Sequence, residues 1–102
     1  MSPSGFQLPP AVREAIRELA ARWLPRGAVI WLFGSFATGT ACRDSDLDLA
    51  VEWAGVRDEA TRAQLWAEIE ALPTVRPIDV VDLSEAAPAF IAAIRPTMRR
   101  VA

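Results

Sequence analysis

Two aspartates stand one residue apart where a polar stretch gives way to an apolar one. In GSFATGTACRDSDLDLAV, residues 34–51, Asp46 and Asp48 flank Leu47. Alternate side chains of a strand point to opposite faces, so both carboxylates would share one face while Leu47 and Leu49 point into the core. Neighbouring carboxylates repel each other unless a cation lies between them. Oxygen ligands suit Mg²⁺, which prefers one or two carboxylates together with substrate phosphates.

Ten residues separate a Gly-Ser pair, Gly34 and Ser35, from the first of these aspartates. An apolar run ends at Gly34, where glycine allows a tight turn or a close backbone approach. Ser35 and the amides after it can open a helical turn, whose N–H groups and hydroxyl can bind phosphate. Taken alone, such an acidic stretch is more often a solvated turn than a metal site. The combined spacing instead predicts a phosphate cradle and a metal site joined by one loop.

A third carboxylate is available from PIDVVDL, residues 77–83. Asp79 and Asp82 are three positions apart, so on a regular strand they point to opposite faces. Only one of them can face the first pair of aspartates, and the spacing alone leaves both choices open. The other is expected at the end of the strand, near Ser84.

Six segments that carry helix or strand spacing must position these residues. Helical spacing occurs at 9–25, 57–72 and 85–94. Apolar runs typical of strands occupy 28–33, 47–53 and 77–83. Asp58 and Ser84 are expected to cap the second and third helices. The order α-β-β-α-β-α predicts an α/β (α+β) fold, a small mixed β-sheet with helices mainly on one face, as a single domain over residues 1–102.

The other large apolar and basic side chains are expected to have structural roles. Core positions are predicted for Trp23, Trp31, Trp53 and Trp66. Solvated helix faces are predicted for Arg13, Arg17, Arg62, Arg99 and Arg100. Cys42 is expected to be an incidental loop thiol, since a lone cysteine cannot form an internal disulfide.

The composition of the chain indicates which kinds of partner and which catalytic groups can be expected. The formal net charge is −2, and the 11 basic residues are scattered arginines, so a nucleic-acid partner is not expected. No apolar run approaches the length of a membrane span and the N-terminus lacks a secretory pattern, which predicts a cytoplasmic protein without membrane contact. With no histidine, chemistry must depend on carboxylates, hydroxyls, arginines and metal ions.

The motif GS…SDLDLAV resembles the signature of the DNA polymerase beta-type nucleotidyltransferase superfamily. The short chain, its opening helix and PIDVVDLSEA resemble the minimal nucleotidyltransferase (MNT) domain proteins, which are often encoded beside HEPN-domain partners. This resemblance covers about residues 10–95 and implies a nucleotidyltransferase-like core.

The resemblance also implies roles for the motif residues. Gly34 and Ser35 would hold the phosphates of a nucleotide, and Asp46 and Asp48 would bind two Mg²⁺ ions. Asp79 would be the third carboxylate, so these three aspartates would be both the catalytic residues and the metal ligands.

This chain departs from the family pattern between the Gly-Ser pair and the next glycine. Many members carry arginines there, whereas this chain has Phe36 and Thr38, and Arg43 is expected to supply charge to the nucleotide instead.

The implied activity is Mg²⁺-dependent transfer of an adenylyl group from ATP to a hydroxyl of a HEPN-type toxin, with the chain acting as antitoxin. Because the chain is too small to enclose a nucleotide, a partner chain or a second copy is expected to complete the site. Two alternatives stay open: an antitoxin that acts by contact alone with a vestigial metal site, and a small-molecule nucleotidyltransferase of the antibiotic-modifying kind.

Overall fold

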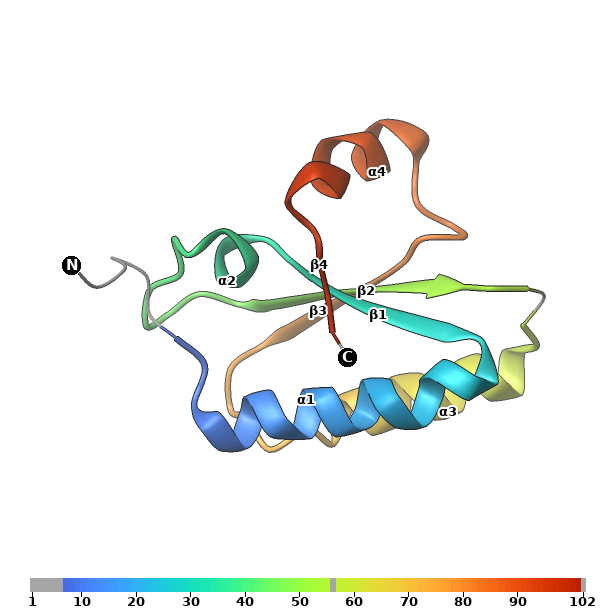
Figure 1. Cartoon of the computed structure of the whole chain (residues 1–102), viewed down its shortest axis with the longest axis horizontal. Helices are drawn as coiled ribbons and strands as arrows, with labels where there is room; N and C mark the ends of the chain where they lie inside the picture. Colours follow the sequence, from blue (N-terminus) through green and yellow to red (C-terminus); the bar gives the residue numbers. More distant parts are fainter. Residues whose placement is uncertain (1–6, 56, 102) are drawn as a thin grey trace.

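The computed structural model describes residues 7–55 and 57–101, which form a four-stranded mixed sheet with helices on both faces (Figure 1). In chain order the elements are α1 (Pro10–Trp23), the 3-10 turn η1 (Leu24–Arg26), β1 (Ala28–Phe33), α2 (Ser35–Thr38), β2 (Leu47–Trp53), α3 (Glu59–Glu70), β3 (Ile78–Asp82), α4 (Pro88–Ile94), the 3-10 turn η2 (Arg95–Thr97) and β4 (Arg99–Arg100). The strand order is β3-β2-β1-β4. β1 is antiparallel to β2 and β4, and β2 is parallel to β3, which confirms the predicted mixed sheet.

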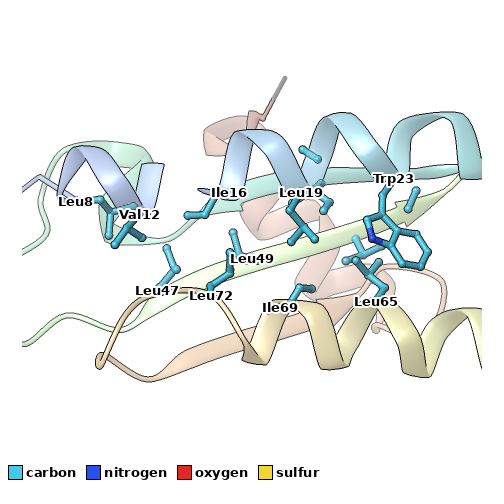
Figure 2. Packing of buried hydrophobic residues seen from close by; sticks show 14 residues of the cluster. Leu8, Val12, Ile16, Leu19, Trp23, Leu47, Leu49, Leu65, Ile69 and Leu72 are labelled. Carbon is cyan, nitrogen blue, oxygen red and sulfur yellow. The ribbon is translucent and has the colours of Figure 1, made fainter. Parts of the chain in front are cut away.

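The main core lies between one face of the sheet and the helices α1 and α3. The buried residues of α1 recur at helical spacing: Val12, Ile16, Leu19, Ala20 and Trp23. Figure 2 shows the four larger of these side chains, those other than Ala20, facing Leu47 and Leu49 from β2 and Leu65 and Ile69 from α3. Fully burying one such side chain stabilises the fold by about 1.5–3 kcal/mol. This layer therefore fixes the sheet on which any functional side chain of β2 must stand.

The opposite face of the sheet is covered less completely. Figure 1 shows α4, near the C-terminal end, above the sheet, on the side away from α1 and α3. A smaller cluster forms beneath it, with Phe33, Ala50 and Leu83 buried. The helices therefore lie mainly on one face, as predicted, and the second face stays partly open.

The pleat of β2 assigns its residues alternately to these two faces. Leu47, Leu49 and Val51 belong to the main core, whereas Ala50 belongs to the smaller cluster on the other side. Asp48 lies between two core residues in the chain and so points to the same side as Ala50. The alternation that was expected for Asp48 is confirmed.

The predicted start of the last helix and its cap are wrong. α4 begins at Pro88, not at residue 85, and its N-cap residue is Ala87, which makes no side-chain capping bond. The backbone N–H and the hydroxyl of Ser84 both donate to Oδ1 of Asp82, at 2.9 and 2.6 Å. Ser84 is thus engaged by the end of β3, and Pro88, whose fixed φ suits a first helical position, starts the helix instead. The other predicted cap is confirmed: Asp58 accepts the N–H of Thr61 at 2.7 Å.

Three of the arginines assigned to solvated helix faces have other positions. Arg62 is only 26% exposed in its side chain, and its Nε donates to Asp82 at 3.0 Å. Arg99 and Arg100 are exposed, but they form β4, which pairs with Trp31 and Leu32 of β1.

Of the tryptophans, Trp23 is buried. Trp53 and Trp66 are partly buried against the main core, and Trp31 is partly buried against the smaller cluster. Trp31 also donates from Nε1 to Glu52. Among the residues that the structure describes, no helix is long and apolar enough to cross a membrane.

Candidate active site

A glycine turn joins β1 to α2 beside the carboxylate of Asp48. Gly34 has φ +73° and ψ −155°, a conformation that is essentially restricted to glycine. Its carbonyl accepts the N–H groups of Ala37 and Thr38, both at 3.1 Å, so α2 begins directly at Ser35. A Cβ atom at Gly34 would collide with the carboxylate of Asp48. Both the backbone conformation and the lack of a side chain therefore allow this turn to lie against Asp48.

Asp48 and Asp79 are direct partners in the register of the two parallel strands β2 and β3. On its other side, Asp48 is paired with Phe33, the residue before Gly34. Asp46 comes just before β2, two positions from Asp48 and so on the same side of the pleat. Asp46 and Asp79 are exposed, and Asp48 is half-buried. The topology thus places three carboxylates and the Gly34 turn at one edge of the open face.

The electrostatic environment of Asp48 disfavours its ionised form. Burial raises the pKa of Asp48, and the neighbouring charges of Asp79 and then Asp46 raise it further. A cation between the carboxylates would remove this repulsion.

The donor set fits Mg²⁺, because it consists of oxygen atoms alone. Within residues 7–55 and 57–101, no group of three or more acidic or cysteine side chains is placed so that it could hold a metal ion. A Mg²⁺ ion at this edge would therefore take part of its shell from water and phosphate oxygens.

Asp82, the alternative third carboxylate, lies on the other face of β3. Its side chain is 2% exposed and contacts Nη2 of Arg57 and Nε of Arg62, each at 3.0 Å. Burial alone would raise the pKa of Asp82, but hydrogen bonds from Ser84 and Arg62 and the charge of Arg57 outweigh it and lower the pKa. Asp79, and not Asp82, therefore lies beside Asp48, while Asp82 ends the strand near Ser84 as expected.

Arg43 lies apart from these residues in the loop before β2. It is exposed and lines a shallow groove of about 520 Å³ together with Asp44 and the segment 73–77. None of the other five predicted site residues lines this groove. A contact between Arg43 and a nucleotide stays a prediction.

Sequence reasoning did not single out Arg76. Its Nη1 donates to the carbonyl oxygens of Ser45 and Arg43, and its guanidinium stands over the ring of Phe36. Nothing in the local sequence signals this role, because the partners of Arg76, in the loop before β2 and on α2, lie more than 30 residues away in the chain. Cys42 is exposed and free, as expected for a loop thiol.

Comparison with known proteins places this geometry in a family. Residues 15–101 match the family model described as Polymerase beta, Nucleotidyltransferase. The chain belongs to this family. Among relatives of this nucleotidyltransferase, protein adenylyltransferase MntA of Shewanella oneidensis (strain ATCC 700550 / MR-1) is 40% identical over 63 residues. The alignment covers 62% of this chain and 45% of MntA, so the chain spans less than half the length of that curated relative.

Solved structures of similar nucleotidyltransferases share the fold. A structure assigned as a minimal nucleotidyltransferase is 34% identical, with a TM-score of 0.67 over 84% of this chain and 89% of that one. The structure of a tri-AMPylated Shewanella oneidensis HEPN toxin in complex with an MNT antitoxin contains a chain that is 25% identical. That match has a TM-score of 0.59 and covers 89% of this chain and 69% of the other. The resemblance to minimal nucleotidyltransferases is therefore confirmed in both sequence and fold.

Proposed function

We propose that the chain is a Mg²⁺-dependent nucleotidyltransferase that transfers adenylyl groups from ATP to a hydroxyl of a HEPN-type partner protein, and so acts as its antitoxin. The observation that carries the proposal is the contact between the Gly34 turn and Asp48, with Asp79 in register beside it. A phosphate-binding turn and a carboxylate edge in this arrangement suit transfer of a phosphoryl-type group. Because ATP is the donor, we assign the reaction to the cytoplasm.

Each side chain of the site has a defined task in this proposal. The hydroxyl of Ser35 and the amides at the start of α2 would hold the phosphates of ATP. Asp46, Asp48 and Asp79 would hold two Mg²⁺ ions, which when bound neutralise phosphate charge and lower the pKa of the acceptor hydroxyl.

The reaction replaces one bond at the α-phosphorus of ATP with another. The acceptor oxygen forms the new bond to the α-phosphorus. The bond between the α-phosphorus and the oxygen that bridges it to the β-phosphorus breaks, and pyrophosphate leaves with that oxygen. Asp79, which is exposed on the open face, is placed to accept the proton of the acceptor hydroxyl.

The acceptor is expected on another protein. This chain contains no tyrosine, so the most acidic common hydroxyl, with a pKa of about 10, must come from elsewhere. Exposure of Asp46 and Asp79 leaves the edge accessible to a partner segment or to a second copy of the chain. MntA, the relative described above, is a protein adenylyltransferase, and the solved HEPN toxin was AMPylated in its complex with an MNT antitoxin.

Mass spectrometry tests the proposal directly. The chain is incubated with ATP, Mg²⁺ and a HEPN-type partner protein, and the intact mass of that protein is measured. We expect discrete increments of one adenylyl group each, mapped by fragmentation to a side-chain oxygen and absent with Asp48→Asn. A partner that stays unmodified in the presence of the unaltered chain would refute adenylyl transfer.

A second candidate, an antitoxin that acts by contact alone, is favoured by the side chains that follow Ser35. The hydroxyl of Thr38 bonds within α2 and to Thr40, and Phe36 faces Arg76, so neither position supplies a cation to a triphosphate. This candidate predicts an unmodified partner that is nevertheless inhibited in a stable complex.

A further inference from the structure

The guanidinium of Arg76 connects the loop before β2 with α2. The proposed reaction needs both segments in fixed relative positions, because Asp46 follows the loop and Ser35 begins α2. The Nη1 atom of Arg76 lies 2.7 Å from the carbonyl oxygen of Ser45 and 2.9 Å from that of Arg43. The same group stands over the ring of Phe36, 5.0 Å from the ring centroid. A planar cation can satisfy carbonyl acceptors and an aromatic face at once.

The backbone around Arg76 is itself held in place. The carbonyl of the next residue, Pro77, accepts the N–H of Leu47 at 2.9 Å, at the start of the pairing between β2 and β3. The N–H of Arg76 donates to Oγ1 of Thr74 at 3.2 Å. The side chain therefore reaches out from a fixed point of the sheet.

The groups that Arg76 contacts are direct neighbours of the candidate site residues. The carbonyl of Ser45 belongs to the peptide bond that leads into Asp46, so holding it sets the orientation of that aspartate. Phe36 follows Ser35 on α2. The hydrogen bonds between Cys42 and Ser45 lie within the loop, whereas Arg76 links the loop to β3 and α2.

We propose that Arg76 is a positioning residue that holds Asp46 near Ser35, the first residue of α2, so that one Mg²⁺-bound nucleotide can contact both residues. This inference rests on the proposed function. Arg76 acts through the Ser45 peptide and Phe36 rather than through the nucleotide. A lysine would keep the charge and could donate to both carbonyls, which share the one donor Nη1, but its ammonium lacks the planar face that stands over the ring of Phe36.

Three variants test the inference: Arg76→Gln, Arg76→Lys and the matched control Arg26→Gln. Arg26 also stacks on an aromatic ring, that of Trp23, and its Nη2 donates a hydrogen bond to Gln64, whereas Arg76 donates to two carbonyls. Arg26 lies in η1, which follows the C-terminal end of α1. Arg26→Gln therefore removes, as Arg76→Gln does, an arginine that stacks on an aromatic ring, and so controls for the loss of that stacking alone.

Binding of ATP is measured by calorimetry as Mg²⁺ is varied. We expect Arg76→Gln to weaken Mg²⁺-dependent ATP binding about ten- to hundredfold, the range typical of residues that orient metal ligands. Arg76→Lys should recover part of this loss, and Arg26→Gln should bind as the unaltered chain does. Hydrogen exchange of the amides of Cys42 and Ser45 should be faster in Arg76→Gln alone.

Each outcome bears on one of the two proposals. If the unaltered chain does not bind ATP with Mg²⁺, the proposed function fails, and this inference fails with it. If the unaltered chain binds and Arg76→Gln binds equally well, the inference alone is overturned. Weaker binding with unchanged exchange in the loop would also overturn it, since Arg76 would then not act by holding the loop.

Discussion

Asp48 stands where burial and two neighbouring carboxylates all oppose its negative charge. Because the fold raises the pKa of Asp48, the folded protein binds this proton more tightly than the unfolded chain does. This proton therefore stabilises the folded state at pH values below the pKa of Asp48 in the unfolded chain, which is about 4. The stabilisation is lost as the pH rises through the higher pKa of the folded state. At neutral pH without a cation, the ionised group therefore opposes folding.

Replacing Asp48 by asparagine should separate chemistry from stability. We expect Asp48→Asn to lower adenylyl transfer more than about a hundredfold, because a proposed metal ligand is lost. Its melting temperature at pH 7 should equal or exceed that of the unaltered chain, and this difference should vanish near pH 3. Thermal melts between pH 3 and pH 8 in EDTA measure this. A large loss of stability at pH 7 would instead make Asp48 a structural residue.

Gly34 allows a second test at a single residue, with Gly39 as its control. Gly34→Ala should destabilise the fold by about 1–3 kcal/mol through backbone strain, and should displace Asp48 and abolish transfer. Gly39 also has a positive φ, +79°, but a Cβ there meets nothing within 4 Å. Gly39→Ala should cost about 1–2 kcal/mol and leave transfer intact below its melting temperature. Equal activity of the two variants would contradict this contact.

The sequence indicated some of these residues and not others, for a physical reason. The shared face of Asp46 and Asp48 follows from local alternation, which β2 obeys. Arg62 and Arg76 were missed because their partners Asp82 and Ser45 lie 20 and 31 residues away. Such contacts depend on how the elements meet, and no local spacing reveals them.

At the scale of elements, β3 carries two aspartates in opposite environments. Asp79 is exposed on the open face beside Asp48, and Asp82 is buried on the other face between Arg57 and Arg62. Besides Asp82, these two arginines contact Glu85. Asp82 therefore joins the end of β3 to the N-terminal part of α3 and to the segment that follows β3.

Asparagine at each position should give opposite phenotypes. Asp79→Asn should lose transfer with little change in stability, because its carboxylate is exposed. Asp82→Asn should lower stability by about 2–3 kcal/mol, since Arg57 and Arg62 lose their buried carboxylate partner and keep the exposed Glu85, and should retain transfer below its melting temperature. Parallel melts and transfer assays on both variants provide the comparison. Loss of transfer in folded Asp82→Asn, with activity kept in Asp79→Asn, would reverse the assignment of the third carboxylate.

Element boundaries were predictable where a regular apolar pattern set them. β1 and β2 match the expected ranges 28–33 and 47–53 because each is an apolar run whose residues are mostly buried or partly buried within the sheet. β4 has two exposed residues and pairs through its backbone, so it left no apolar signal. The start of α4 was misjudged because Ser84 bonds to Asp82, two residues before it, rather than to the first turn of a helix.

At the scale of the whole molecule, acid stability should depend on the same buried aspartate. The fold lowers the pKa of Asp82, so its contribution is present above the unfolded pKa and is lost as the pH falls through the folded value. The stability difference between the unaltered chain and Asp82→Asn should therefore be largest at pH 7 and shrink below about pH 4. Urea unfolding at pH 7 and pH 3 tests this. A difference that stays constant with pH would show that Asp82 acts through its shape rather than its charge.

The pleat of β2 sends neighbouring side chains to opposite faces: Leu47 and Leu49 pack in the core, and Asp48 between them lies on the open face. Selection can therefore act on one set without disturbing the other. A single base change at the codon for Asp48 can therefore remove the proposed metal ligand and leave a folded surface of nearly the same shape. Under the proposed function, one such step would turn an enzyme into a chain that acts by contact alone.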